Sequence, residues 1–311
     1  MIVDGSEGSL KKFLADLAPV DQVGADSRAA MLATRSIKTT SKAWAIDMAI
    51  SMVDLTTLEG ADSPGKVKAL CSKAVRPDPT DPTVPMVGAI CVYNDMVKIA
   101  RTELNTLGGK DIAVAAVATA FPSGRASLAV KKLDTQDALN AGANEIDMVI
   151  DRGAFLSGRV GEVFEEIKII KQLCGDKAHL KVILETGELV TYDNVRKASY
   201  LAMLAGADFI KTSTGKVTPA ATASVVLVML EAVRDYFLLT GNKIGVKPAG
   251  GIRTTKDAIK QLVLVNETAG PEWLNPSLFR IGASALLNDL LIQRIKLRTG
   301  HYASANYVTM D

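Results

Sequence analysis

Two lysines stand at the ends of apolar runs that are typical of β-strands. Lys211 closes the run 208–211, and Lys247 closes the run 243–247. A lysine at such a position either extends into solvent, as most lysines do, or turns into an enclosed site. In an enclosed site, burial and a second ammonium both favour the neutral amine, which attacks a carbonyl to form a Schiff base. Periodicity leaves both interpretations open.

A carboxylate interrupts another apolar run. Asp147 lies within 145–150, on the opposite strand face from its two apolar neighbours. Buried carboxylates are rarely left unpaired. Asp147 is therefore either a proton-transfer group beside an interior lysine or half of a core salt bridge. Glu185, at the end of the run 181–185, has the same two interpretations.

Three glycine-bearing turns follow the last three apolar runs, at 213–216, 248–253 and 282–284. The backbone N–H groups of such turns can approach an anion closely, and phosphate sites of β/α barrels commonly form there. Lys216 and Arg253 would add positive charge. The turns indicate a phosphorylated substrate, although tight connections also use glycine for its positive φ alone.

Eight short apolar runs, with helical patterns between them, must position these side chains. Their near-continuous hydrophobicity is typical of parallel strands, and the intervening segments are long enough for crossovers. Eight β-then-α units predict an α/β fold, a TIM (β/α)8 barrel. An open doubly wound sheet would carry a glycine-rich turn after its first strand, and none is present. We expect strands at 51–55, 87–92, 113–119, 145–150, 181–185, 208–211, 243–247 and 279–282, and helices at 126–141, 161–173, 192–205, 220–239 and 255–265.

The barrel determines where functional side chains lie. Catalytic residues of this fold occupy the C-terminal ends of strands and the loops that follow. Because side chains alternate along a strand, a helix-facing Ile210 places Lys211 inside the barrel. Unusual side chains gather in the strands at Asp54, Cys91, Asp147, Lys181, Glu185, Lys211 and Lys247.

We divide the chain into three parts. Residues 1–45 form a partly helical N-terminal extension, 46–300 the catalytic barrel and 301–311 a C-terminal tail. Apolar residues at helical spacing predict a helix over 9–20 in the extension. We assign no chemistry to the extension.

Composition limits the function classes. The 311 residues are 48% hydrophobic and 23% charged, as in soluble globular enzymes. Basic and acidic residues balance at a net charge of +2, so we expect neither nucleic acid nor a membrane surface as a partner. The chain start does not resemble a secretory signal. Three widely spaced cysteines, Cys71, Cys91 and Cys174, indicate a reducing compartment, and we expect a cytoplasmic protein.

Two segments around the strand-end lysines look like family signatures. They are Phe209-Ile-Lys-Thr-Ser-Thr-Gly-Lys216 and Val246-Lys-Pro-Ala-Gly-Gly-Ile-Arg-Thr254. They resemble the signature segments of the deoxyribose-phosphate aldolase family, which are class I aldolases. The similarity covers roughly residues 47–307 in order and spacing, and it includes 52–58, 89–93, 144–149, 180–189, 196–199 and 280–284.

The resemblance implies a reaction and roles for the buried charges. The reaction is the reversible cleavage of 2-deoxy-D-ribose 5-phosphate to D-glyceraldehyde 3-phosphate and acetaldehyde, without a cofactor or metal. Lys211 matches the Schiff-base lysine of the family. Asp147 and Lys247 match its proton-transfer pair, and Asp54 and Lys181 match further charged members of the network.

Substrate contacts and assembly are implied in the same way. Cys91 matches a cysteine near the substrate, but it is also read as a small apolar barrel residue. Tyr307 resembles a C-terminal tyrosine that reaches into the site; the alternative is a disordered tail. The family implies a homo-dimer or homo-tetramer. With the glycine turns, it places substrate and phosphate contacts at Thr214, Gly215, Lys216, Gly250, Gly251, Arg253, Gly282 and Ser284.

The sequence departs from the family in two places. Asn94 and Asp95 stand where many relatives carry proline and arginine, which indicates a different second loop. Ala285 replaces a second serine, which removes one hydroxyl donor to phosphate.

Two rival functions fit the residues less well. A metal-dependent aldolase recruits several histidines to one site, whereas this chain has only His179 and His301, neither at the C-terminal end of an expected strand. A non-catalytic barrel that binds sugar phosphates is the other alternative. Such a protein has no need of a neutralised lysine.

Overall fold

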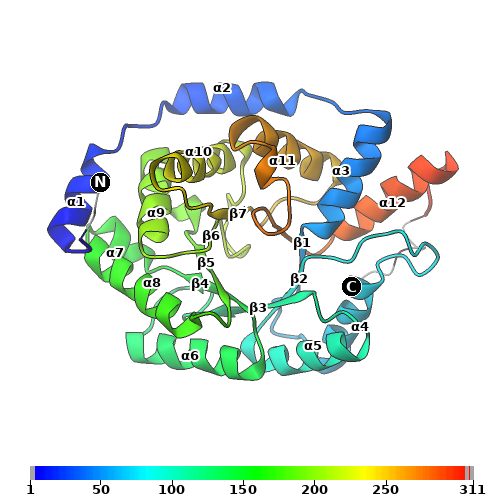
Figure 1. Ribbon diagram of the computed structural model, residues 1–311, viewed down its shortest axis with the longest axis horizontal. Coiled ribbons are helices and arrows are strands. Elements are labelled where there is room, and N and C mark those ends of the chain that lie inside the picture. The colour runs from blue at the N-terminus through cyan, green and yellow to red at the C-terminus, as the bar shows by residue number, and fades with distance from the viewer. Residues whose placement is uncertain (1–3, 305–307, 309–311) are drawn as a thin grey trace.

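The computed structural model describes residues 4–304 and 308. Its parallel strands form one sheet in the order β7-β6-β5-β4-β3-β2-β1-β8. Single bridges join Val246 to Phe279 and Ala249 to Gly282, which closes the ring between β7 and β8 (Figure 1). The predicted TIM barrel is therefore confirmed. The strands are β1 (Val53–Thr56), β2 (Ala89–Val92), β3 (Ala113–Ala118), β4 (Glu145–Val149), β5 (His179–Ile183), β6 (Phe209–Lys211), β7 (Gly245–Lys247) and β8 (Ile281–Ala283).

Helices surround this ring and cover its outer face (Figure 1). Serine or threonine side chains cap many of their N-termini, as in α4, α6, α9, α10 and α11. The helices of the barrel are α3 (Thr39–Ser51), α4 (Pro64–Val75), α5 (Asn94–Thr106), α6 (Leu128–Ala141), α7 (Arg152–Leu156), α8 (Val160–Cys174), α9 (Tyr192–Leu204), α10 (Ala223–Thr240), α11 (Thr255–Thr268) and α12 (Leu286–Thr299), with 3-10 turns η1 (Thr186–Glu188) and η2 (Pro271–Trp273).

Most predicted boundaries differ from the observed ones by a few residues, and two of the differences bear on the site. The helix expected at 220–239 begins at Ala223, because the Thr222 side chain accepts a hydrogen bond from the Val225 backbone and caps the helix. The strand expected to reach Glu185 ends at Ile183. Glu185 lies beyond the strand in a left-handed backbone conformation, with φ of 53°.

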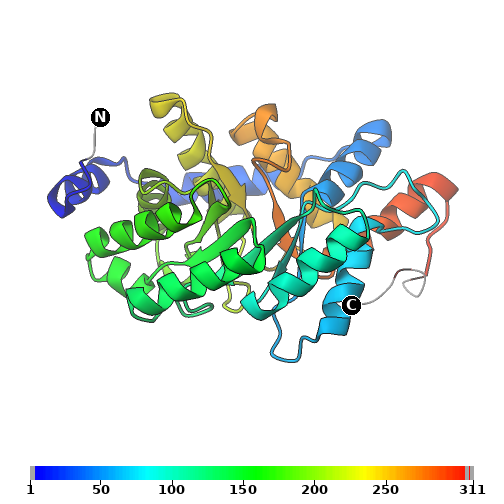
Figure 2. The ribbon, with the colours of Figure 1, turned by 60° about the horizontal axis from the view of Figure 1, so that its bottom comes forward.

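Two helices precede the barrel. Helix α1 (Glu7–Asp16) ends before the predicted limit at residue 20, because Pro19 disfavours helix at the residue before it. Helix α2 (Gln22–Ala33) packs across α10 and α11 on the outside of the ring (Figure 1). Figure 2 shows α1 and α12 at opposite ends of the molecule. Helix α3 runs through residue 45, where we divided the extension from the barrel. The division itself stays a prediction.

The core has an outer layer and an inner layer. Ile146, Met148 and Ile210 belong to the large apolar cluster between strands and helices. The alternate positions of the same strands face the barrel interior, where a small apolar cluster around Leu58 and Cys91 occupies one side. The rest of the interior holds buried charged side chains together with apolar ones such as Phe209, whose ring contacts Lys181.

Candidate active site

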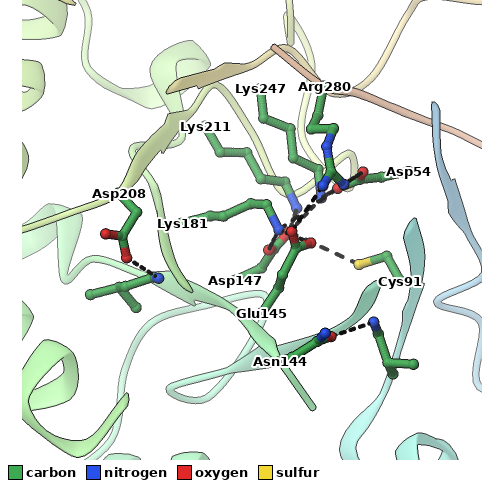
Figure 3. Close-up of polar contacts among 12 residues, drawn as sticks. Asp54, Cys91, Asn144, Glu145, Asp147, Lys181, Asp208, Lys211, Lys247 and Arg280 are labelled. Carbon is green, nitrogen blue, oxygen red and sulfur yellow. Dashed lines mark hydrogen bonds and ion pairs between the residues drawn. The ribbon is translucent and has the colours of Figure 1, made fainter. Parts of the chain in front are cut away.

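Seven charged side chains meet inside the barrel (Figure 3). They come from five different strands and from the residue just before β8. None is more than 8% exposed. We call this group the charge cluster; its members are Asp54, Glu145, Asp147, Lys181, Lys211, Lys247 and Arg280.

The upper half of the charge cluster joins two lysines to one carboxylate. The Nζ atoms of Lys211 and Lys247 each lie 2.7 Å from Oδ2 of Asp147. Lys247 Nζ also lies 2.5 Å from Oδ2 of Asp54. Because both amines contact one carboxylate oxygen, they are direct neighbours. The structure thus brings together the three residues expected to do the chemistry.

The other members of the charge cluster, Lys181, Glu145 and Arg280, lie deeper in the barrel. Lys181 forms an ion pair with Glu145 and lies 3.5 Å from Oδ1 of Asp147. The Arg280 guanidinium donates to Oδ1 of Asp54 at 2.7 Å and to Oε1 of Glu145 at 3.1 Å. Sequence reasoning assigned no function to Glu145 or Arg280. Glu145 had a usable signal, since it lies two residues before Asp147 on the same strand face.

The pairing sets the ionisation of the cluster. Burial raises the pKa of Asp147, but Lys211, Lys247 and Lys181 outweigh burial and hold that pKa well below its usual range. Burial lowers the pKa of Lys247, but Asp147 and Asp54 outweigh it and hold the pKa well above its usual range. Lys247 is therefore an ammonium at neutral pH, and Asp147 is a carboxylate.

Cys91 touches the same carboxylate. Its Sγ lies 4.0 Å from Oδ2 of Asp147, within the inner apolar cluster. Burial raises the pKa of its thiol, so the side chain stays a neutral S–H. It is a small buried side chain beside the charge cluster and is not among the residues that line the cavity, so its nearness to the substrate stays a prediction.

A cavity of about 490 Å³ opens above the charge cluster. Lys211 is the one member of the cluster that lines it. Glu59 and Leu58, from the loop after β1, line it as well. Every residue expected to contact substrate or phosphate also lines this cavity: Thr214, Gly215, Lys216, Gly250, Gly251, Arg253, Gly282 and Ser284.

Glycine is needed at these turns for two physical reasons. Gly250 and Gly251 have φ of +85° and +87°, which residues with side chains rarely adopt. Gly282 instead has no room, because a Cβ there would lie 2.9 Å from Cβ of Ala249. The turns after β6 and β7 are joined by Thr212, whose hydroxyl accepts a hydrogen bond from the Ala249 backbone at 2.9 Å.

A buried lysine beside a cationic neighbour, under a cavity with glycine turns, is an arrangement suited to Schiff-base chemistry on an anionic carbonyl compound. A family model described as "DeoC/LacD family aldolase" matches residues 48–291. The chain belongs to this aldolase family. It is therefore an enzyme that makes or breaks carbon–carbon bonds.

Relatives and solved structures agree with this family. The chain is 46% identical over 287 residues to the deoxyribose-phosphate aldolase of Homo sapiens, covering 90% of each chain. It is 45% identical over 277 residues to that of Bos taurus, covering 86% of each. The structure of QR15, an aldolase, superimposes with a TM-score of 0.61 at 29% identity, covering 79% of this chain and 97% of that one. The tetrameric deoxyribose phosphate aldolase from Aeropyrum pernix, at 23% identity and a TM-score of 0.61, covers 85% and 100% and shows the shared fold.

Within this aldolase family, the two departures have structural counterparts. Asn94 begins α5, and its side-chain amide donates to the Asp134 backbone carbonyl at 2.9 Å, which ties the second loop to α6. Ala285 is the N-cap residue of α12 and provides no side-chain capping bond. Tyr307, expected to reach the site, lies outside the described residues.

Proposed function

We propose that this aldolase reversibly cleaves 2-deoxy-D-ribose 5-phosphate to D-glyceraldehyde 3-phosphate and acetaldehyde through a Schiff base on Lys211. The observation that carries the proposal is the position of Lys211, which alone connects the buried charge cluster to the cavity with its glycine turns. The names of the relatives at 45–46% identity support the choice of substrate.

The charge balance favours Lys211 as the neutral amine. The cluster holds four basic side chains and three carboxylates, and its arginine stays protonated. A neutral buried cluster therefore requires one lysine without its proton. Lys247 and Lys181 each contact more than one carboxylate of the cluster, whereas Lys211 contacts Asp147 and shares it with Lys247. Removing the proton from Lys211 leaves three cations facing three carboxylates.

The chemistry follows from a neutral amine at this place. In the cleavage direction, the Lys211 amine attacks the C1 aldehyde and water leaves, which gives a protonated Schiff base. The iminium accepts the electron pair of the C2–C3 bond as the C3 hydroxyl loses its proton. D-Glyceraldehyde 3-phosphate leaves, and an enamine remains on Lys211. A proton then adds to C2, and water releases acetaldehyde and the free amine.

The neighbours of Lys211 supply charge and protons. The Lys247 ammonium lies 2.7 Å from the Asp147 oxygen that it shares with Lys211, which places a cation beside the reacting amine. Asp147 and Lys247, with water, move the protons at C2 and at the C3 oxygen. Asp54 and Lys181 hold this pair in place from below.

The glycine turns would bind the phosphate. The turns after β6, β7 and β8 line one side of the cavity together with the start of α12, where backbone N–H groups favour anions. Lys216 and Arg253 line the same side and add charge. Ser284, which also lines the cavity, would add a hydroxyl donor.

The wider setting of the enzyme is part of the proposal. We infer a catabolic role, in which deoxyribose phosphate from deoxyribonucleotide breakdown enters central carbohydrate chemistry. The three cysteines are free and buried, which fits a reducing cytoplasm. Among the described helices, none is long and apolar enough to span a membrane. A homo-dimer or homo-tetramer is expected, and the Aeropyrum pernix relative is a tetramer by its description.

Reductive trapping tests the Schiff base directly. Acetaldehyde should condense with the Lys211 amine, and borohydride should reduce the imine, so that the intact protein gains the mass of one ethyl group. Peptide mapping should place the group on Lys211, and the Lys211→Ala variant should stay unmodified. Wild-type protein of unchanged mass, or an ethyl group on another lysine, would exclude the proposed mechanism.

An ion pair between two residues that line the cavity should weaken substrate binding. The Nζ atom of Lys216 lies 2.9 Å from Oε1 of Glu59, and both residues line the cavity. The carboxylate therefore competes with an anionic substrate for this lysine. The Glu59→Gln variant should show a KM for deoxyribose 5-phosphate about two- to fivefold lower than wild type at low salt. The difference should vanish in about 1 M salt, where charges are screened over about 3 Å; a KM that stays the same at low salt contradicts the competition.

A further inference from the structure

Glu185 is a buried carboxylate for which the proposed chemistry has no task. It follows β5, is fully buried, and lies apart from the charge cluster. Its backbone is left-handed, with φ of 53° and ψ of 61°. Such a conformation is uncommon for a residue with a side chain and persists only where the surroundings hold it. Strain of this kind often accompanies a functional constraint.

The Glu185 side chain holds the turn after β6. Its Oε2 accepts a hydrogen bond from the Thr214 hydroxyl at 2.5 Å, and its Oε1 accepts one from the Thr214 backbone N–H at 3.2 Å. The Thr214 hydroxyl oxygen in turn accepts a hydrogen bond from the backbone N–H of Lys216 at 3.1 Å. Between them lies Gly215, with φ of +80°. One carboxylate thus fixes the shape of a turn whose three residues all line the cavity.

The backbone that follows Glu185 is in close contact with the loop after β6. The Thr186 backbone N–H donates to the Thr212 carbonyl at 2.9 Å. A Cβ at Gly187 would lie 2.1 Å from the carbonyl oxygen of Pro219, so only glycine allows this approach. The turn η1 after β5 therefore packs directly against the loop after β6.

The surroundings of Glu185 explain why these hydrogen bonds matter. Burial raises the pKa of Glu185 above its usual value, and the hydrogen bonds from Thr214 and the charge of Arg152 offset only part of this rise. Arg152 is itself paired with Glu188, whose charge raises the pKa of Glu185. The Thr214 donors are thus the main groups that replace the water lost by the buried carboxylate.

We propose that Glu185 is a positioning residue, whose carboxylate holds the 214–216 turn in the shape that receives the substrate phosphate. The inference rests on the proposed function for the identity of the substrate. A purely structural residue would affect the whole active site when it is replaced. Glu185 contacts the 214–216 turn and not the reacting amine of Lys211, so its replacement should affect phosphate binding alone.

The Glu185→Gln variant tests the proposal. An amide keeps the size of the side chain but presents an N–H₂ group where Thr214 needs an acceptor. The KM for deoxyribose 5-phosphate should rise about tenfold or more, as expected when hydrogen bonds to a charged group are lost. The kcat, and kcat/KM for unphosphorylated 2-deoxyribose, should stay within about twofold of wild type. Equal losses on both substrates, or an unchanged KM, would overturn the proposal.

Two further variants separate the effect of the carboxylate on KM from the effect of the left-handed backbone. Glu185→Gly adopts the left-handed conformation without strain but has no carboxylate, so it should fold and show the same rise in KM. Glu185→Asp keeps the carboxylate and should recover part of the affinity. A Glu185→Gly variant with wild-type KM would show that the backbone alone shapes the turn, and would exclude the positioning role.

Equilibrium binding of inorganic phosphate gives a readout that does not depend on turnover. Its dissociation constant should rise about tenfold in Glu185→Gln, even if deoxyribose 5-phosphate is not the substrate. Acetaldehyde trapping on Lys211 should be equally fast in wild type and variant, because acetaldehyde carries no phosphate. Failed trapping in the wild type would therefore refute the proposed function, whereas unchanged phosphate binding in the variant would refute the role of Glu185.

Discussion

The Lys211→Ala variant is expected to lose turnover of deoxyribose 5-phosphate by roughly 10⁴-fold or more, because the proposed nucleophile is gone. The loss should come without loss of fold. Asp147 keeps its contacts with Lys247 and Lys181, so no buried carboxylate is left alone. Retro-aldol rates, measured with a coupled assay for D-glyceraldehyde 3-phosphate, and the melting temperature together check both parts.

Lys247→Met is the matched control for this loss. Lys247 contacts the same Asp147 oxygen at the same 2.7 Å, but it does not line the cavity. Its removal should slow turnover, by roughly 10²- to 10⁴-fold for a group that assists proton transfer. Because three cations then face three carboxylates, Lys211 should keep its proton more often, so trapping should be slower but should still place the ethyl group on Lys211. Trapping on Lys247 in the Lys211→Ala variant, or full activity of that variant, would reverse the assigned roles.

Once a barrel is assumed, the alternation of side chains along a strand predicts which residues face its interior. Strand side chains alternate, so apolar positions such as Ile210 facing the helices forced Lys211 inward. The same alternation placed Asp147 inside, between Ile146 and Met148. These inferences need only local periodicity, which the parallel strands preserve.

Only the structure shows how far each charged side chain lies from the cavity. Lys181 is paired in register with Asp147 and with Phe209, whereas Lys211 is paired with Lys247. Lys181 therefore lies two residues further from the cavity than Lys211. This offset depends on the stagger of strands around the barrel, which no single strand encodes. The family resemblance singled out Lys211, but the strand pattern by itself could not show which lysine lines the cavity.

Contacts between segments far apart in the sequence could not be predicted either. Arg280 precedes β8 but bridges Asp54 on β1 and Glu145 on β4. Glu185 looked like a strand end, yet it leaves the strand and holds Thr214. In both cases, the partner is determined by the closed ring and not by the spacing of residues.

The Arg280→Met variant is expected to lower the free energy of unfolding by about 3–5 kcal/mol, since Asp54 and Glu145 each lose one of the cations that neutralise them and its charged hydrogen bond. Arg280 bridges Asp54 and Glu145, which are both buried. Arg294→Met is a matched control, because Arg294 also bridges two carboxylates, those of Asp47 and Asp81, at a more exposed place. The control should lose at most about 1 kcal/mol. Urea unfolding near neutral pH measures both, and equal losses would contradict the importance of the buried bridge.

The pH dependence of this difference identifies its cause. Burial raises the pKa of Asp54, but Lys247, Arg280 and Lys181 outweigh it and hold that pKa below its usual value of about 4. The ionised Asp54 therefore stabilises the wild type fully above about pH 4, and this stabilisation is lost as the pH falls further. Without Arg280, the pKa of Asp54 rises, so the variant loses less in acid. The stability gap between wild type and Arg280→Met should thus narrow at about pH 3. A gap of constant size would instead assign the loss to packing of the arginine side chain.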